Sequence, residues 1–273
     1  MIDFTVNTVT CTKCGLCAAD CPARIISLDG GNPRIAPEKE VLCYKCQHCL
    51  TVCPTASLSI LGLQPCNSLS LAGGLPDSAS MELLIKGRRA VRKYKTENVE
   101  PETIAQLLSV ASHAPSGKND RQLRFTVVDD RAKLDVIRDE IMVKLVAIAQ
   151  GTGFPAGMEF FAGCVRQWEI DGIDFVFRGA PHFLVVSAPK SIVTPVEDGL
   201  IALSTFELYA QTLGIGTVWD GLAKFIIGDL LPEFKVRLGI PDDHAIGYAM
   251  AFGWPAVQYT RTAQREPDAV HYV

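Results

Sequence analysis

Two runs of cysteine decide how the N-terminal part of this chain folds. The first reads Cys11-Thr12-Lys13-Cys14-Gly15-Leu16-Cys17-Ala18-Ala19-Asp20-Cys21-Pro22, and the second reads Cys43-Tyr44-Lys45-Cys46-Gln47-His48-Cys49-Leu50-Thr51-Val52-Cys53-Pro54. Both have the spacing C-x-x-C-x-x-C-x-x-x-C-P, and the second run starts 32 positions after the first. Eight of the ten cysteines therefore belong to one internal repeat, which predicts two equivalent metal centres.

Thiolates at this spacing favour iron–sulfur cubes that share their ligands crosswise. Three cysteines at three-residue intervals curl around one cube, and the fourth, held away by proline, reaches the neighbouring cube. We therefore expect one [4Fe–4S] cluster on Cys11, Cys14, Cys17 and Cys53, and a second on Cys43, Cys46, Cys49 and Cys21. Zinc is the alternative, but a zinc site needs four ligands and usually takes two C-x-x-C pairs. The doubled motif resembles the two-cluster bacterial ferredoxins.

Length and composition indicate a folded protein with more than this one domain. The chain has 273 residues, far more than a small ferredoxin, and is 48% hydrophobic and 21% charged. A formal net charge of −4 argues against a general nucleic-acid binder. Residues 1–10 lack the basic start and apolar run of a signal peptide, and cluster-bearing thiolates favour a reducing interior. We expect a cytoplasmic protein.

The uncharged stretch 51–76 is long enough to be checked as a membrane span. It contains Pro54, Pro65 and Gly73-Gly74 among several serines, which would break a helix and leave polar groups unpaired in lipid. We therefore expect no membrane segment. The ferredoxin-like domain should cover residues 1–62, with a small hairpin turning at Asp29-Gly30-Gly31-Asn32. Residues 63–80 should form a linker in which Cys66 is a free or packed thiol, and residues 81–273 a second domain.

The second domain alternates helical and strand patterns, which predicts an α+β fold with a covered sheet. Pro101 should open a helix that ends before Pro115, and Asp198 should cap a later helix. The remaining expected elements are a long helix from Leu134 to Ile148 and strands at 125–128, 183–186, 214–219 and 245–252.

Four short motifs in this domain point to a flavin. Residues 86–95 carry six positive charges, which alone would suggest a solvated basic face or a nucleic-acid contact. They are followed by Ala114-Pro115-Ser116-Gly117-Lys118-Asn119, by Gly214-Ile215-Gly216-Thr217-Val218-Trp219 and by Arg265-Glu266-Pro267. In this order, over residues 81–268, they resemble the FMN-dependent nitroreductase family. The resemblance implies an α/β/α domain with a central mixed, mostly antiparallel sheet, and places the basic segment on a helix.

The resemblance also implies a role for individual residues, each of which stays an expectation here. Arg88, Arg89 and Arg265 would neutralise the FMN phosphate, and Arg92 would lie at the pyrimidine end of the ring. Ser116 and Asn119 would hydrogen-bond the ring and the ribityl chain, although ordinary loop capping is the alternative for both. The backbone amides of Asp220 and Gly221 would face flavin N5. Ala90 and Arg121 depart from the family, which has serine and glutamine there.

Residues 151–178 insert an aromatic-rich segment between a helix and a strand. The segment contains Phe154, Phe160, Phe161, Cys164, Trp168, Phe175 and Phe177. Aromatic residues at this density usually pack in a core, but the resemblance implies that the segment also covers the flavin. Because it carries more apolar surface than a short excursion buries, we expect it to help form a homodimer.

Two functions of different classes remain open. The first is an iron–sulfur flavoprotein oxidoreductase that passes electrons from the clusters to FMN and on to a small electron-poor substrate, such as a nitroaromatic or an activated alkene. In that case the chemistry is on FMN and no protein residue need be catalytic. The second is a non-enzymatic electron-transfer or redox-sensing module, for which about 190 further residues would be excessive.

The sequence leaves the donor and the substrate unnamed. No G-x-G-x-x-G follows a strand, so no separate nucleotide domain is predicted, and the donor is a one-electron protein or NAD(P)H. The roles of Arg121, Cys66 and Cys164 also stay open.

Overall fold

The computed structural model of this protein describes residues 1–29 and 31–273, which group into two units. The first unit comprises Met1–Pro76 together with Lys118–Asp120, and the second comprises Asp77–Gly117 together with Arg121–Val273. The division at Pro76 falls within the segment 63–80 that the sequence suggests as a linker. Among the described residues, no helix is long and apolar enough to cross a membrane.

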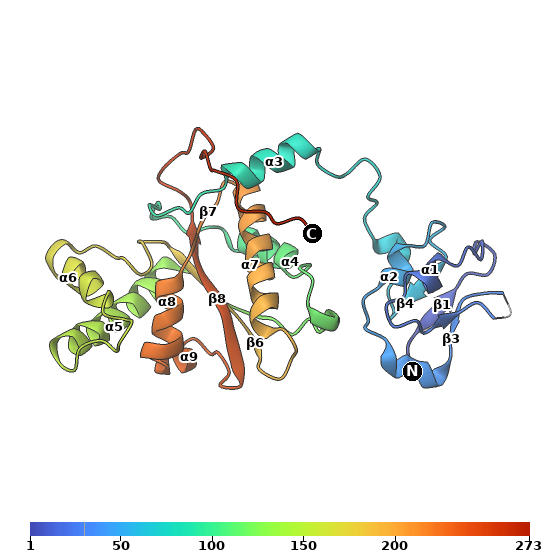
Figure 1. Cartoon of the computed structure of the whole chain (residues 1–273), viewed down its shortest axis with the longest axis horizontal. Helices are drawn as coiled ribbons and strands as arrows, with labels where there is room; N and C mark the ends of the chain where they lie inside the picture. The colour runs from blue at the N-terminus through green and yellow to red at the C-terminus, as the bar shows by residue number, and fades with distance from the viewer. Residues whose placement is uncertain (30) are drawn as a thin grey trace. The chain divides into compact units, whose positions relative to one another are not determined.

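The first unit repeats itself in structure as it does in sequence. Helices α1 (Leu16–Ala19) and α2 (His48–Thr51) begin 32 residues apart, as do strands β2 (Ile26–Ser27) and β4 (Leu58–Ile60). Strand β1 (Phe4–Val6) pairs antiparallel with β4, and β2 pairs antiparallel with β3 (Arg34–Ile35). The expected hairpin is therefore present, although Gly30 of its turn lies outside the described residues. Short 3-10 helices η1 (Pro37–Leu42) and η2 (Pro65–Asn67) complete this unit (Figure 1).

A four-stranded antiparallel sheet organises the second unit. Its strands are β5 (Arg124–Val128), β6 (His182–Pro189), β8 (His244–Gly253) and β7 (Gly216–Trp219), in that spatial order. Helix α4 (Pro101–Ala111) precedes β5, helices α5 (Arg131–Gln150) and α6 (Phe161–Asp171) connect β5 to β6, and α7 (Pro195–Thr212) connects β6 to β7. Helix α8 (Gly221–Phe225), the π-helix η4 (Ile226–Leu230) and α9 (Glu233–Arg237) lie between β7 and β8. The α+β class and the mostly antiparallel sheet are as expected, and the four strands and three helices predicted from apolar periodicity are present.

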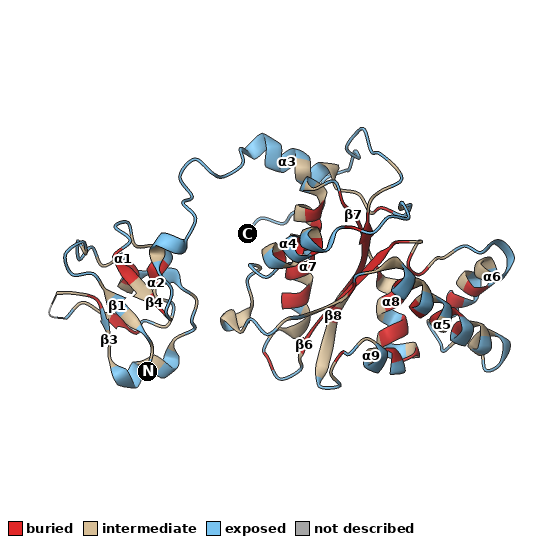
Figure 2. Ribbon diagram, turned by 180° about the vertical axis from the view of Figure 1, so that it is seen from behind, coloured by how far each residue is buried: buried red, intermediate tan, exposed pale blue. Residues whose placement is uncertain are grey.

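Helices cover both faces of this sheet because the buried strands alternate their side chains. In β6, Leu184 and Val186 pack with α4 and α7, whereas Phe183 and Val185 pack with α5, α6 and the α8–α9 region. Figure 2 shows the buried residues along β8 and on the inner side of α7. Two separate cores result, one on each face, and together they make the unit an α/β/α layer structure.

The basic segment is extended, which corrects the expectation of a helix. Helix α3 (Ser78–Gly87) is capped by Asp77, which accepts the Ser80 N–H at 3.0 Å, and it ends before Arg88. Ala90 then forms a parallel bridge with Thr217 of β7, and the Val91 N–H donates to the Thr217 carbonyl at 2.8 Å. A side chain at Gly216 would approach Val91 to 2.6 Å. The segment can therefore lie directly along β7 only because residue 216 is glycine.

Asp198 is the second correction. It lies inside the first turn of α7, whose N-cap residue is Thr194. The acid still acts at this helix end, because its Oδ1 accepts the Thr194 hydroxyl at 2.8 Å. Pro195 at the first helical position explains why the helix starts earlier than the sequence suggested.

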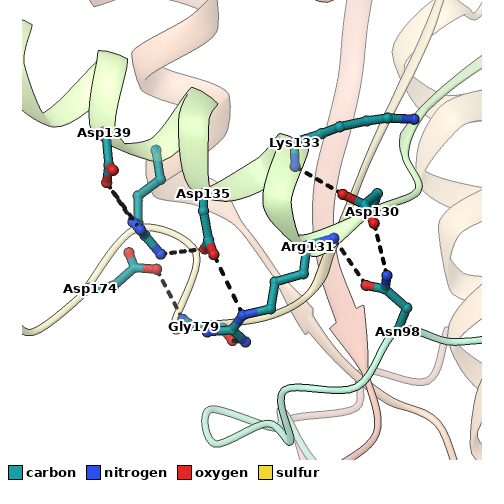
Figure 3. A network of polar contacts seen from close by, with 9 residues as sticks. Asn98, Asp130, Arg131, Lys133, Asp135, Asp139, Asp174 and Gly179 are labelled. Atoms are coloured by element: carbon teal, nitrogen blue, oxygen red, sulfur yellow. Dashed lines mark hydrogen bonds and ion pairs between the residues drawn. The ribbon is translucent and has the colours of Figure 1, made fainter.

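The turn 174–179 is held by the start of helix α5, as Figure 3 shows. Asp174 accepts the Phe177 N–H at 2.8 Å and the Gly179 N–H at 2.9 Å. Arg131 donates to the Gly179 carbonyl at 3.3 Å and pairs with Asp135 at 3.5 Å. The end of the aromatic segment is therefore fixed on the body of the unit.

Candidate functional site

The eight repeat cysteines line two separate cavities in the first unit. One cavity is lined by Cys11, Cys14, Cys17 and Cys53, together with apolar residues such as Val6, Leu16 and Leu58. The other is lined by Cys21, Cys43, Cys46 and Cys49, together with Ile25, Ile26 and Ile60. All ten cysteines are free thiols, so no disulfide competes for these side chains. Each cavity thus offers four sulfur ligands in an apolar shell, a donor set that fits an iron–sulfur cube.

The backbone around each cavity carries the same unusual conformation. Lys13 and Lys45 have φ values of 58° and 54°, and their neighbours Gly15 and Gln47 have 80° and 63°. Left-handed residues in a turn can direct backbone N–H groups toward a bound anion. Because a non-glycine residue in this region costs roughly 1–2 kcal/mol, its presence at both repeat positions supports two anionic clusters.

The cysteines that shift the pKa values of the two buried thiols, Cys17 and Cys49, fall into the same two sets as the cavity linings. Burial raises the pKa of the Cys17 thiol, and the adjacent Cys53 and Cys14 raise it further. Burial raises the pKa of Cys49 to about 12, with further contributions from Cys46, Cys21 and Cys43. Cys53 is therefore close to Cys17, and Cys21 is close to Cys49, as crossed ligation requires.

A cavity of about 120 Å³ in the second unit gathers part of the predicted flavin site. Its lining includes Arg92 from the basic segment, Trp219 and Asp220 at the end of β7, and Gly221 at the start of α8. Phe175 and Arg178, from the turn held by Asp174, line the cavity as well. The Arg178 guanidinium lies 4.6 Å from the Phe175 ring centroid. Two cations and two aromatic rings suit a flat, electron-rich ring system.

The Asp220 amide does not face this cavity, which corrects one expectation. It donates to the Ala249 carbonyl of β8 at 2.9 Å and so continues the strand pairing of β7. Of the two amides assigned to flavin N5, the Gly221 amide remains the candidate. The Asp220 side chain instead lies at the cavity, 4% exposed, and its Oδ1 accepts the Ala223 N–H at 2.8 Å to cap α8.

Arg88 is engaged by a buried acid that sequence reasoning missed. It donates to Glu207 Oε1 at 3.1 Å, and Thr217 donates to the same oxygen at 3.1 Å. Trp219 Nε1 donates to Glu207 Oε2 at 3.0 Å. Glu207 is 5% exposed and therefore joins α7, β7 and the basic segment at one point. A charged residue among Leu203, Phe206 and Ala210, on the buried side of a helix, is the sequence signal that could have identified it.

Arg89 lines a second cavity, of about 400 Å³, next to the first residues of β7. Gln211, Gly214 and Tyr259 also line it, and Arg89 itself bonds only to the Lys86 carbonyl, at 3.2 Å, among the described residues. Arg265 is exposed in the C-terminal tail and lines neither cavity. The structure therefore leaves the shared phosphate role of Arg88, Arg89 and Arg265 as a prediction.

The loop after α4 is anchored by Asp198, a contact that the sequence did not predict. Its Oδ1 accepts the Gly117 N–H at 3.0 Å, and a side chain at Gly117 would meet the Thr194 hydroxyl at 2.2 Å. Ser116 Oγ accepts the Arg121 N–H at 3.1 Å, a capping contact of the kind considered as its alternative role. Ser116 lines neither flavin-side cavity, and Asn119 groups with the first unit.

Two family models match this chain. The model of the nitroreductase family matches residues 85–254, more than half of the chain. This chain belongs to the nitroreductase family. A 4Fe-4S dicluster domain model matches residues 10–58, so the two predicted parts of the sequence are both present.

Relatives support the family but carry several different names. A putative NADH dehydrogenase/NAD(P)H nitroreductase from Methanothermobacter thermautotrophicus is 26% identical over 68% of this chain and 83% of its own length. A 5,6-dimethylbenzimidazole synthase from Rhodospirillum rubrum is 26% identical over 66% and 83%, respectively. A solved Desulfitobacterium hafniense nitroreductase with bound FMN shares 27% identity at a TM-score of 0.56, covering 72% of this chain and 100% of its own.

Proposed function

We propose that this nitroreductase-family protein passes electrons from two [4Fe–4S] clusters to FMN and from there to a small electron-poor compound. Family membership makes it an FMN-dependent oxidoreductase. The observation that carries the proposal is the presence of a dicluster unit and a nitroreductase-family unit in a single chain. Nitroaromatics and activated alkenes are the acceptor classes that we favour, and we place the protein in the cytoplasm, where cluster thiolates persist.

We assign the cluster ligands crosswise. The two cavities support one cluster on Cys11, Cys14, Cys17 and Cys53, and the other on Cys43, Cys46, Cys49 and Cys21. FMN, when bound, supplies hydride transfer and one-electron chemistry in the same group. Arg92 would stabilise negative charge at the pyrimidine end, Gly221 would donate its amide, and the Phe175 and Trp219 side chains would restrict water.

The phosphate assignment predicts a specific loss of FMN affinity. Arg89→Ala should weaken FMN binding about ten- to a hundredfold, because one charge-assisted hydrogen bond contributes about 1.5–3 kcal/mol. Lys93→Ala is the matched control, since it removes an exposed positive charge from the same segment outside both cavities. Fluorescence titration of the flavin-free full chain gives the dissociation constants. An unchanged constant in Arg89→Ala would remove this residue from the phosphate site.

We further propose a homodimer, in which a second copy completes the flavin site with Ser116 and Asn119. The proposal is supported by the cavities at Arg89 and Arg92, because neither includes Ser116. Exposed Phe160, Ile170 and Ile173 of the aromatic segment supply apolar surface for an interface. Light scattering should give twice the chain mass at micromolar concentration. Co-expressed Arg89→Ala and Ser116→Ala chains should regain FMN in mixed dimers, whereas an FMN-loaded monomer would contradict this arrangement.

An anaerobic acceptor screen tests the enzymatic function directly. The purified protein is reduced either by a reduced one-electron carrier such as ferredoxin or by NAD(P)H, and then mixed with nitroaromatic and activated-alkene acceptors. Reoxidation of the flavin absorbance together with a reduced product supports the enzyme. The alternative, a non-enzymatic electron-transfer or redox-sensing module, is favoured if the flavin exchanges electrons with carriers but with no acceptor of either class.

A further inference from the structure

Asp220 lines the cavity at the end of β7 and has a buried carboxyl oxygen without a partner among the described residues. Its Oδ1 caps α8 through the Ala223 N–H, but its Oδ2 is buried and has no hydrogen-bond partner among the described residues. Asp220 forms no ion pair in the part of the chain that the structure describes, although Arg92 and Arg178 line the same cavity. A buried carboxylate without a partner is costly, and the group relieves this cost by holding a proton.

The residues around Asp220 also favour its protonated form. Burial raises the pKa of Asp220 to about 8, the Ala223 N–H lowers it, Asp174 raises it further, and Arg178 offsets part of the rise. Tyr94, which donates to the Ala251 carbonyl, has a pKa raised by its own burial and then by the charge of Asp220. The titratable and charged groups around Asp220 are Arg92 and Tyr94 of the basic segment, Asp174 and Arg178 of the turn, Lys224 of α8, Tyr248 of β8 and, through Trp219, Glu207 of α7.

We propose that Asp220 is the proton donor of the flavin cavity. The inference rests on the proposed function and adds a residue to it. FMN, when bound and reduced, would supply a hydride to one atom of an electron-poor double bond, and the electron pair of that bond would move to the other atom. The Oδ2–H bond of Asp220 breaks to protonate that atom, and the carboxylate regains a proton from water. Arg178 stabilises the carboxylate that forms in between.

The first test needs no bound flavin. Because the folded-state pKa is raised, Asp220 contributes stability that is fully present below its unfolded pKa of about 4 and is lost as pH rises through about 8. We expect the unfolding constant of the wild type, relative to Asp220→Asn, to rise nearly tenfold per pH unit between about pH 5 and 8. Asparagine keeps the α8 cap, and the three tryptophans, Trp168, Trp219 and Trp254, all report on the second unit.

Asp130→Asn is the matched control for this test. Asp130 caps α5 by accepting the Lys133 N–H at 3.1 Å, but unlike Asp220 it is only partly buried, and its pKa is lowered by that N–H and by Asn98. The same chemical change there should produce no loss of relative stability toward alkaline pH. If the unfolding constants of wild type and Asp220→Asn changed with pH in the same way, Asp220 would be ionised in the folded state, and the proposal would be overturned.

The second test asks whether this proton belongs to the flavin cavity. Midpoint potentials of the FMN-loaded full chain are measured from about pH 7.5 to 9.5. Reduction adds negative charge beside Asp220, so above about pH 8, where Asp220 is largely ionised before reduction, the wild type should take up as much as one more proton per electron pair than Asp220→Asn and show the steeper slope. Equal slopes would mean that Asp220 has only a structural role, and they would contradict the proposal. Failure of the proposed function is read separately, from wild type alone, as absence of FMN or of any reduced acceptor.

Discussion

Replacing Cys21 by alanine should remove the cluster bound by Cys43, Cys46 and Cys49, and leave the cluster bound by Cys21's own sequence neighbours. Cys21 lines the cavity of the second cysteine run, and Cys53 lines that of the first. Iron analysis should give half of the wild-type iron, and the remaining cluster should keep its spectrum. The second unit has its own core, so the variant should bind FMN as the wild type does.

The same variant tests the electron route. If both clusters lie on the path, flavin reduction by a one-electron protein donor should fall to the background rate in rapid mixing. Reduction of the flavin by dithionite should be unaffected, because a small reductant can reach the flavin directly. Cys66→Ala is the control, since Cys66 is an exposed thiol outside both cavities.

Two outcomes would overturn this mechanism in different ways. Loss of the cluster bound by Cys11, Cys14 and Cys17 in the Cys21 variant would show that each run binds its own cube. Unchanged flavin reduction with half the iron missing would show that this cluster is not on the path. The mirror variant Cys53→Ala should affect the other cluster, which makes the crossed assignment testable from both sides.

The first unit could be predicted from the sequence in detail because its chemistry is local. Cysteine spacing, glycine turns and a repeat offset of 32 residues all act over short stretches, and the structure places the side chains accordingly. Helices α4, α5 and α7 and the four strands of the second unit were also predictable, since apolar periodicity marks them, whereas α3, α6 and the short helices after β7 were not predicted. The sheet order β5-β6-β8-β7 was not predicted, because pairing between distant strands leaves no local signal.

The flavin cavity was predicted only in part, because its polar residues act across large sequence distances. Arg92 and Gly221 were expected at the cavity, and both line it. The role of the Asp220 amide was wrong because strand pairing with Ala249 extends one residue beyond β7. Glu207 was missed because an acid within a helix normally indicates a solvated face. Its partners Arg88 and Trp219 lie 119 and 12 residues away.

Glu207→Ala should strongly destabilise the second unit. The Glu207 and Arg88 side chains are 6% and 27% exposed, and loss of the carboxylate leaves Arg88, Thr217 and Trp219 without this acceptor. Removal of one member of a buried ion pair costs about 3–5 kcal/mol, and partial exposure of Arg88 places the expected loss near the lower limit. Anaerobic urea unfolding of the full chain, followed by tryptophan fluorescence, gives the free energy of unfolding. The fluorescence of Trp219 should respond directly to the substitution, because its Nε1 donates to Glu207.

A double-mutant cycle separates the ion pair from the remaining contacts. Arg88→Met together with Glu207→Leu should recover most of the lost free energy, because no charge is then left buried without its partner. The stability of Glu207→Gln should fall between those of wild type and Glu207→Ala, since the amide oxygen can still accept one hydrogen bond.

The FMN dissociation constant shows whether Arg88 also binds the cofactor. If Arg88 binds the phosphate, Arg88→Met should lose FMN affinity even in the stabilised double variant. If it only connects the basic segment to α7, the double variant should bind FMN as the wild type does. A loss below about 1 kcal/mol in Glu207→Ala would place this carboxylate among the weak surface pairs and would contradict the buried junction.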